Sequence, residues 1–295
     1  MKISIIGAGS IGLLFASYIA DFFEVTVYSK TEEQAKLIEE HGIVLIKGND
    51  KKSVQVKALP FEKYMRDEDL TILAVKQYQL TEVLPAVNGG NLFFLQNGMG
   101  HLETLQKLSS ENIYVGSVEH GALKENEWTV RHNGEGITKS AIFRGSSEAL
   151  ISLSNTLSGF FPISLEVDYY EMLLKKLVAN AVINPLTAVL GVPNGRLLDN
   201  PYYHMVFKQM FEEIAHILKL KNKEEMLKSV IEICQKTAKN RSSMLKDVEA
   251  HRKTEIDAIL GYVVMEAEKQ NIKAPLTENF YHMLKGKEKN REGKS

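Results

Sequence analysis

The sequence predicts an α/β protein, with a parallel sheet in its N-terminal part and only helices in its C-terminal part. In the first 165 residues, short β-rich runs alternate with helical segments, which favours right-handed βαβ units. A glycine-rich turn separates the first β-rich run from the first helical segment. Beyond residue 165, β-rich runs are absent and apolar residues recur at three-and-four spacing. We therefore expect two domains, 1–165 and 166–295.

Each expected element has a local signal. The strands of the parallel sheet are expected at 2–6, 24–29, 70–76, 91–96 and 112–117. Residues 42–59 contain two β-rich runs around a Gly-Asn-Asp turn, which predicts a hairpin inserted on that sheet. Residues 128–145 suggest a further antiparallel element. The helices of the second domain are expected at 168–191, 202–219, 223–239 and 255–271, followed by a frayed, charged tail at 285–295.

The totals limit the classes of function. A length of 295 residues favours two cores over one. The net charge of −1 gives no reason to expect a nucleic-acid or anionic-membrane partner. The N-terminus is not expected to be a signal peptide, and no stretch is expected to approach the roughly 20 apolar residues of a bilayer span. The single cysteine, Cys234, is expected to be a core thiol, and the protein is expected to be cytoplasmic, without a metal site.

The turn GAGSIG at 7–12 matches the pattern G-x-G-x-x-G of dinucleotide-binding, Rossmann-like domains. Gly7 would permit the tight turn, Gly9 the approach of a pyrophosphate, and Gly12 the packing of helix on strand. The cofactor-binding residues expected here are Gly7, Ala8, Gly9, Ser10, Ile11 and Gly12. The alternative is a glycine-rich turn that binds no ligand.

The end of the second strand bears on the choice between NAD and NADP. An acidic residue there would bind the ribose hydroxyls of NAD, but this sequence has Ser29, Lys30 and Thr31. A cation and two hydroxyls suit a 2′-phosphate, so NADP is favoured, although lysine is less selective than arginine. The alternative is that Lys30 is a solvated surface charge. Lys76 and Asn97 follow two further strands, at the sheet edge where ligands bind.

The helix at 168–191 carries Lys176, Asn180 and Asn184 in one line among apolar residues. These three span roughly 80° of its surface, and burying them without partners would be costly. They should therefore face water, polar protein groups or a ligand. Pro185 should kink or break the helix after Asn184. The turn PNG at 193–195 should expose Asn194.

Glu255 lies at the flank of an apolar helix face, so it is either a rim charge or a cleft residue. Ser242 and Ser243 precede a helical segment and resemble helix caps. Such a cap can still present its hydroxyl to a cleft.

Together these segments closely resemble the ketopantoate reductase family. The resemblance rests on GAGSIG, LAVK, QNGMG, KLVANAVINPLTAVLGVPNG and NRSSMLKDVEAHRKTEIDAILG, and covers residues 1 to about 275. It implies a Rossmann domain joined to an all-helical domain, with the active site in the cleft between them. It also implies reduction of ketopantoate to pantoate by NADPH, towards pantothenate and coenzyme A. Lys30 departs from the family, in which arginine is common at this position.

The resemblance also implies roles for single residues. Lys176 matches the catalytic lysine that protonates the ketone oxygen, and Glu255 matches a catalytic glutamate that binds substrate hydroxyls. Lys76 matches a lysine near the cofactor, and Asn97 an asparagine between cofactor and substrate. The other substrate-contacting positions are Asn180, Asn184, Asn194 and Ser243.

Two other functions stay open. One is a related NADP-dependent reductase of another branched 2-keto acid. The other is a non-catalytic NADP(H)-binding sensor, which would not need Lys176 or Glu255. The apolar helices of the second domain could form a homodimer interface or simply a core.

Overall fold

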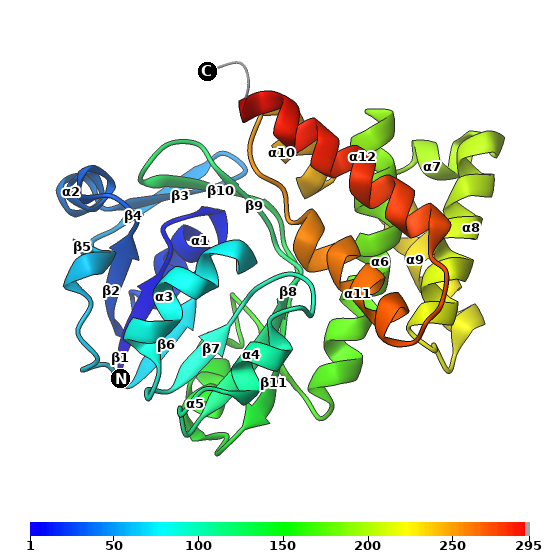
Figure 1. The fold of residues 1–295 in the computed structure, drawn as a ribbon. Coiled ribbons are helices and arrows are strands. Elements are labelled where there is room, and N and C mark those ends of the chain that lie inside the picture. Colours follow the sequence, from blue (N-terminus) through cyan, green and yellow to red (C-terminus); the bar gives the residue numbers. More distant parts are fainter. Residues whose placement is uncertain (293–295) are drawn as a thin grey trace. The chain divides into compact units, whose positions relative to one another are not determined.

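The N-terminal part is built around an eight-stranded sheet (Figure 1). The computed structural model describes residues 1–292. All neighbouring strands of this sheet run parallel except β8 and β11, so the expected parallel sheet is confirmed. In spatial order its strands are β12 (Ile163–Glu166), β11 (Thr138–Arg144), β8 (Ile113–Val118), β7 (Leu92–Phe94), β6 (Leu70–Leu73), β1 (Lys2–Ile6), β2 (Glu24–Ser29) and β5 (Lys57–Pro60).

A second sheet of four strands was not expected from the sequence. Its order is β4 (Asp50–Val54), β3 (Ile43–Lys47), β10 (Thr129–Gly134) and β9 (Gly121–Lys124). The predicted hairpin is confirmed as the antiparallel pair β3–β4, but its placement on the parallel sheet is wrong. The antiparallel element expected at 128–145 is divided, because β10 pairs with β9 in this sheet and β11 pairs with β8 in the other.

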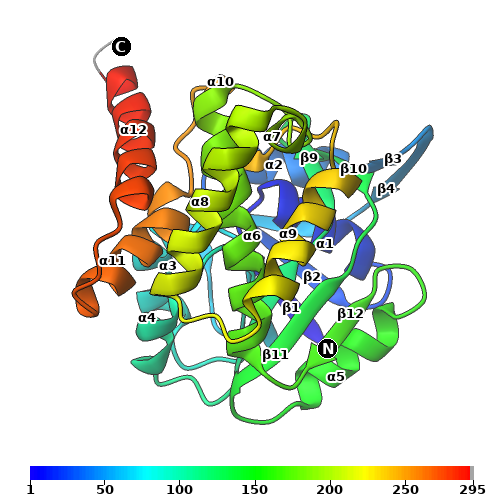
Figure 2. The ribbon, with the colours of Figure 1, turned by 90° about the vertical axis from the view of Figure 1, so that its right-hand side faces the viewer.

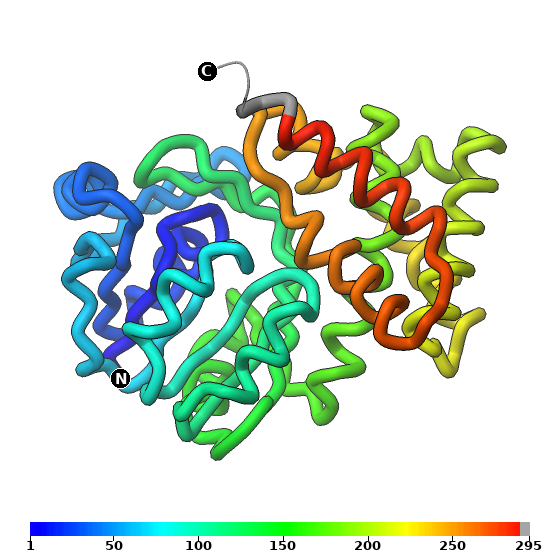
Figure 3. Tube along the Cα trace, viewed as in Figure 1, coloured from blue at the N-terminus to red at the C-terminus, as the bar shows by residue number. Residues whose placement is uncertain are grey.

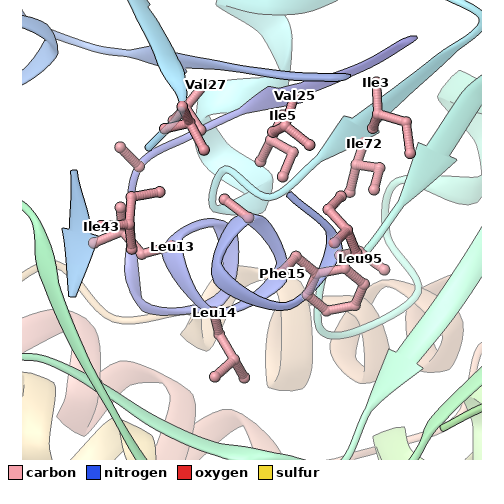
Figure 4. Close-up of a cluster of buried hydrophobic side chains, with 14 of the residues drawn as sticks. Ile3, Ile5, Leu13, Leu14, Phe15, Val25, Val27, Ile43, Ile72 and Leu95 are labelled. Carbon is pink, nitrogen blue, oxygen red and sulfur yellow. The ribbon is translucent and has the colours of Figure 1, made fainter. Parts of the chain in front are cut away.

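The helix α1 (Ser10–Ile19) explains the second sheet. Seven of its ten residues are buried, so it cannot be a surface helix with one solvated face. Its apolar residues share one core with β1, β2 and β6 and with residues of β3 and β10. Figure 4 shows Leu13 beside Ile43 of β3, and Phe15 beside Leu95. The second sheet therefore covers the part of α1 that the parallel sheet leaves open.

The remaining helices of the N-terminal part are short. They are α2 (Glu32–His41), α3 (Leu80–Val87), α4 (Leu102–Gln106) and α5 (Glu148–Leu157), with 3₁₀ turns η1 (Phe61–Lys63) and η2 (Gln77–Gln79).

The C-terminal part, residues 173–292, consists of helices joined by loops, as expected. Figure 2 shows its long helices α6, α8 and α9. Its elements are α6 (Tyr169–Leu190), α7 (Arg196–Asp199), α8 (Pro201–Ile217), α9 (Lys223–Lys236), α10 (Ser243–Glu249), the π-helical turn η3 (Asp257–Gly261), α11 (Tyr262–Lys269) and α12 (Pro275–Glu292).

Backbone contacts divide the chain into two compact units. Residues 1–96 and 103–172 form one, and residues 97–102 with 173–295 form the other. The short segment 97–102 thus leaves the unit that surrounds it in the sequence. The bounds 1–165 and 166–295 expected for the domains stay a prediction.

Pro185 does not break its helix, so a break at this position is wrong, whereas a kink stays a prediction. α6 is one helix of 22 residues with Pro185 inside it. Proline removes one backbone donor, but the residues that follow are held by other contacts. Leu186 and Thr187 are fully buried, and the Thr187 hydroxyl lies 2.9 Å from the carbonyl oxygen of Ile183. Tertiary packing therefore outweighs the local preference of proline.

Two further expectations need correction. α6 is long and apolar enough to cross a membrane by length and composition, contrary to the expectation that the chain has no such stretch. However, 67% of its most apolar window is buried within the protein, as in a core helix. The expected frayed tail is wrong as far as residue 292, because α12 continues to Glu292. The rest of that tail, 293–295, lies outside the described residues.

Candidate active site

The glycine-rich turn lies where the order of the parallel sheet reverses. From β1 the chain passes to β2 on one side and later to β6 on the other. Ligands of doubly wound sheets bind at such a switch point, beyond the carboxyl ends of the strands. Gly7 follows β1 with a φ of 107°, and a Cβ there would lie 2.9 Å from the backbone nitrogen of Val75. Only glycine fits this turn without displacing the segment after β6.

Gly9 and Gly12 differ in what surrounds them. A Cβ at Gly12 would overlap the carbonyl oxygen of Gly7, so this glycine allows α1 to pack on the turn. A Cβ at Gly9 would meet no atom within 4 Å, so the space beside Gly9 is open. Gly9 is the N-cap of α1, and no described side chain caps it. The first amides of α1 therefore face an open space suited to an anion.

Two contacts that were not expected from the sequence hold this turn in place. The Gln34 side chain donates to the carbonyl oxygens of Ala8, at 2.9 Å, and Glu127, at 3.0 Å. The Ser10 hydroxyl accepts from the backbone N–H of Lys124 at 3.0 Å. Gln34 lies on α2 and Lys124 on β9, so no local pattern could reveal either contact. The turn is therefore held by α2 and by β9 of the second sheet.

The three polar residues after β2 have different tasks. Ser29 is 1% exposed, and its hydroxyl donates to the carbonyl oxygen of Thr31 at 2.7 Å. Thr31 caps α2 by accepting from the backbone N–H of Gln34. Lys30 is exposed. The two hydroxyls thus shape the turn, and Lys30 is the residue that carries a charge to its surface.

The segments after β6 and β7 are also fixed by glutamines. The backbone N–H of Lys76 donates to the side chain of Gln79 at 3.0 Å, and the Lys76 side chain is partly buried. The Gln96 side chain donates to the carbonyl oxygens of Leu73 and Val75, each at 2.9 Å. Gln96, the last residue of the first unit before Asn97, is therefore tied to the end of β6.

Asn97 and Glu255 lie in direct contact. The Asn97 amide donates to Glu255 Oε2 at 2.9 Å, across 158 positions of sequence. The neighbouring Gly98 has a φ of 81°, and a Cβ there would overlap the carbonyl oxygen of Ala258. Glycine at this position lets the 97–102 segment pack against the π-helical turn η3. The close approach of two backbones therefore brings the amide to the carboxylate.

Glu255 is 7% exposed, so it is not a rim charge. Glu255 immediately precedes Ile256 and the π-helical turn η3, and η3 continues directly into α11. Single π-helical turns of this kind occur frequently at functional sites. A buried carboxylate requires partners, and the Asn97 amide is one of them.

The polar line on α6 is retained in the structure. Lys176 and Asn180 are partly exposed, and Asn184 is 7% exposed. The residues between them, 177–179 and 181–183, are all buried. Asn184 therefore does not belong to a solvent-exposed stripe. The apolar positions anchor α6 in its own unit, and the line carries one cation and two amides.

Asn194 is not exposed, so that expectation is wrong. It is 7% exposed, and its amide donates to the Thr237 hydroxyl at 2.9 Å. The backbone N–H of Asn194 donates to the carbonyl oxygen of Asn240, which draws the turn against the end of α9. Its Oδ1 is buried and has no hydrogen-bond partner among residues 1–292. The Asn194 side chain is therefore held against the end of α9 and is closed to solvent.

The two serines before α10 also differ. Ser242 is the N-cap and accepts from the backbone N–H of Leu245 at 3.0 Å, as expected. Its hydroxyl lies 2.8 Å from the hydroxyl of Thr187 on α6. Ser243 is the first residue of α10 and is exposed. The cap therefore fixes α10 to α6, while Ser243 carries an accessible hydroxyl.

The expected site residues thus fall into two groups. The first unit holds the dinucleotide loop with Ser29, Lys30 and Lys76. The second unit holds Asn97, the polar line of α6, Asn194, Ser243 and Glu255. Within residues 1–292, no group of three or more His, Cys, Asp or Glu residues could hold a metal ion. Cys234 is fully buried, as expected of a core thiol.

Comparison with known proteins gives a consistent result along the whole chain. Residues 3–145 match the family model "Ketopantoate reductase PanE/ApbA", and residues 168–288 match its C-terminal counterpart. The chain is 43% identical over 295 residues to the 2-dehydropantoate 2-reductase of Bacillus subtilis, covering 98% of both proteins.

Solved structures agree. The probable 2-dehydropantoate 2-reductase from Bacillus subtilis superposes with a TM-score of 0.90 at 41% identity, over 97% of this chain and 100% of that one. D-mandelate dehydrogenase, solved with NADH and anilino(oxo)acetate, has a TM-score of 0.88 at 24% identity over 99% and 100%, and shares the fold. With both family models matched and a full-length relative at 43% identity, the chain belongs to the ketopantoate reductase family.

Proposed function

We propose that this protein reduces 2-dehydropantoate, or ketopantoate, to pantoate with NADPH as the hydride donor. The observation that carries the proposal is the 43% identity, along the whole chain, to a relative named 2-dehydropantoate 2-reductase. The domain bounds 1–165 for the NADP-binding part and 166–295 for the substrate-binding part belong to the same proposal.

The dinucleotide loop is suited to the cofactor. The open space beside Gly9 and the uncapped first turn of α1 would accept the pyrophosphate. The exposed cation of Lys30 would pair with the 2′-phosphate that distinguishes NADPH from NADH. When bound, NADPH supplies the hydride for the carbonyl carbon of the substrate. Lys76, which follows the neighbouring strand, is proposed as a further cofactor contact.

Lys176 is proposed as the general acid. As the carbonyl carbon is reduced, negative charge develops on the ketone oxygen, and a positioned ammonium can stabilise it and donate a proton. Lys176 suits this task because α6 is anchored by buried residues on both sides of it. Asn180 and Asn184 follow on the same line and would hold the substrate in a fixed orientation.

Glu255 and Asn97 are proposed to bind the substrate together. The Asn97 amide orients Glu255 Oε2, and the carboxylate would accept hydrogen bonds from substrate hydroxyls. Asn194 is proposed as a further substrate contact, through an Oδ1 that has no partner among the described residues. The exposed hydroxyl of Ser243 would donate to the substrate carboxylate.

A steady-state assay of NADPH oxidation tests the activity. The rate with ketopantoate should exceed the rate with other branched 2-keto acids, which separates the proposal from a related reductase. Lys176→Ala should lower kcat by about 10²–10⁴-fold while NADPH still binds. Lys175→Ala removes the exposed neighbouring lysine and is the matched control, expected to keep wild-type turnover. Unchanged turnover in Lys176→Ala would show that this lysine is not the acid.

The cofactor preference needs its own test. Lys30→Ala should weaken NADPH binding by about 10–100-fold, as expected for loss of one charge-assisted contact, and leave NADH binding unchanged. Dissociation constants for both cofactors can be measured by fluorescence titration. Equal weakening of both would show that Lys30 does not contact the 2′-phosphate.

A further inference from the structure

We propose that Glu288, acting with Lys285 and Tyr281 on the same face of α12, is a positioning residue for the carboxylate of Glu255. The inference rests on the proposed function, in which Glu255 binds the substrate. It concerns a C-terminal helix to which the sequence pattern assigned no role. Four contacts carry it, and all of them lie within the second unit.

The first two contacts fix the residue before Glu255. Thr254 is 1% exposed, and its backbone N–H donates to Glu288 Oε1 at 2.8 Å. The Thr254 hydroxyl donates to the same oxygen at 2.6 Å. That hydroxyl also accepts from the backbone N–H of Ile256 at 3.2 Å, so Thr254 caps the turn that follows. One carboxylate oxygen of Glu288 therefore holds both the backbone and the side chain of Thr254.

The other two contacts fix Asp257, two residues after Glu255. Asp257 accepts from the Tyr281 hydroxyl at 2.8 Å and from Lys285 Nζ at 2.9 Å. Burial and the hydrogen bond to Asp257 raise the pKa of Tyr281, so its hydroxyl keeps its proton as the donor. Lys285 also lies 3.4 Å from Glu288 Oε2, so it neutralises two carboxylates at once. Its pKa is raised, because these charges outweigh the effect of burial.

The spacing on α12 explains how one helix can reach both sides of Glu255. Tyr281, Lys285 and Glu288 follow each other at intervals of four and three residues, so they share one face of the helix. Figures 1 and 3 show α12 in red, running back past the orange segment that contains Glu255. Gly261 faces the Tyr281 ring, where a Cβ would lie at 3.4 Å.

The α12 contacts act on both sides of Glu255. The Glu255 carbonyl oxygen accepts from the backbone N–H of Ile259 at 3.1 Å, so its backbone leads directly into the π-helical turn at residues 257–261. The contacts from α12 hold the residue before Glu255 and Asp257 within that turn. A displacement of about 1 Å at a reacting or binding group can lower a rate by about 100-fold. Loss of the α12 contacts should therefore reduce catalysis even though none of these residues touches the substrate.

Two variants of Glu288 separate positioning from charge. Glu288→Ala removes the acceptor of both Thr254 bonds, whereas Glu288→Gln keeps an oxygen that can accept them. We expect kcat/KM for ketopantoate to fall about 10–100-fold in Glu288→Ala and to return to within about 3-fold of wild type in Glu288→Gln. Lys287→Ala, which removes an exposed side chain from the same helical turn, is the matched control and should be unchanged. Melting temperatures of all variants set an assay temperature at which each is folded.

The decisive comparison uses a second background. In Glu255→Ala, Glu288→Ala should lower kcat/KM by less than about 2-fold, because the carboxylate that it positions is already absent. The same fall in both backgrounds, or no fall in either, would overturn the inference. If Glu288→Ala does not fold, Tyr281→Phe removes one Asp257 contact with little change in volume, and the same two-background comparison applies. Absence of ketopantoate turnover by the wild-type protein would instead refute the proposed function.

Discussion

The two glycines at the start of α1 lead to a prediction that separates stability from cofactor binding. A Cβ at Gly12 would overlap the backbone carbonyl oxygen of Gly7, whereas a Cβ at Gly9 would meet no atom within 4 Å. Gly12→Ala should therefore destabilise the fold. Gly9→Ala should leave the fold intact and interfere only with a ligand that approaches the turn.

The magnitude follows from the atoms involved. The overlap at Gly12 is with backbone, which cannot rotate away as a flexible side chain could, so the cost should reach the upper end of overpacking, about 3 kcal/mol. For a domain of this size, about 2–4 °C of melting temperature is lost per kcal/mol, so a fall of about 6–12 °C is expected. At Gly9 a weaker helix cap and a less flexible unfolded chain act in opposite directions, and each is below about 1 kcal/mol.

Differential scanning calorimetry and fluorescence titration with NADPH provide the two measurements. Gly12→Ala should lower the melting temperature and the affinity together, because the turn must move. Gly9→Ala should keep the melting temperature within about 2 °C and weaken NADPH binding by at least about 10-fold. A wild-type melting temperature in Gly12→Ala would refute the packing argument. Full NADPH affinity in Gly9→Ala would refute the assignment of this loop to the pyrophosphate.

Three further predictions concern stability and reactivity. Burial lowers the pKa of His120 from 6.5 to about 4. As the pH falls, the histidine of the unfolded chain therefore takes up a proton before that of the folded protein. The free energy of unfolding should decline by up to about 3 kcal/mol between pH 6.5 and 4. Urea denaturation at several pH values checks this, and an unchanged pH dependence in His120→Gln would contradict it. Burial raises the pKa of the Cys234 thiol to about 12, so a thiol reagent should react only after denaturant is added; rapid labelling of the native protein would show otherwise. Thr187→Val removes the hydroxyl beside Ser242 and should lower the free energy of unfolding by about 1–2 kcal/mol. Ser243→Ala, at an exposed position, is the control and should leave the free energy of unfolding unchanged.

The sequence was sufficient for features that depend on near neighbours. These features are the alternation of strands and helices, the turn at 7–12, the hairpin of β3 and β4, and the line Lys176, Asn180 and Asn184. Each is recognised from residues that lie at short, regular spacing in the sequence. Such spacing follows from the geometry of single strands and helices, so it can be recognised without knowing what lies opposite.

Other features depended on contacts between distant parts of the chain. The second sheet joins β3 and β10, and the pair Asn97–Glu255 joins residues 158 positions apart. The same holds for the burial of Asn194 against the end of α9. Each of these depends on which surfaces meet, and side-chain periodicity within one segment carries no information about its partner.

By itself, the sequence determined the two classes of structure, the dinucleotide turn and the residue types available for chemistry. The tertiary structure alone decided which of those residues are buried, which are in contact, and what holds them. Pro185 illustrates the physical reason, because its local preference to end a helix is outweighed by the buried contacts of Leu186 and Thr187. Glu255 illustrates it again: a carboxylate at the flank of a helix face could have been solvated, but Asn97 and the π-helical turn place it in the interior. Local preferences of about 1–3 kcal/mol set the elements, and the larger sum of long-range contacts selects among the arrangements that they allow.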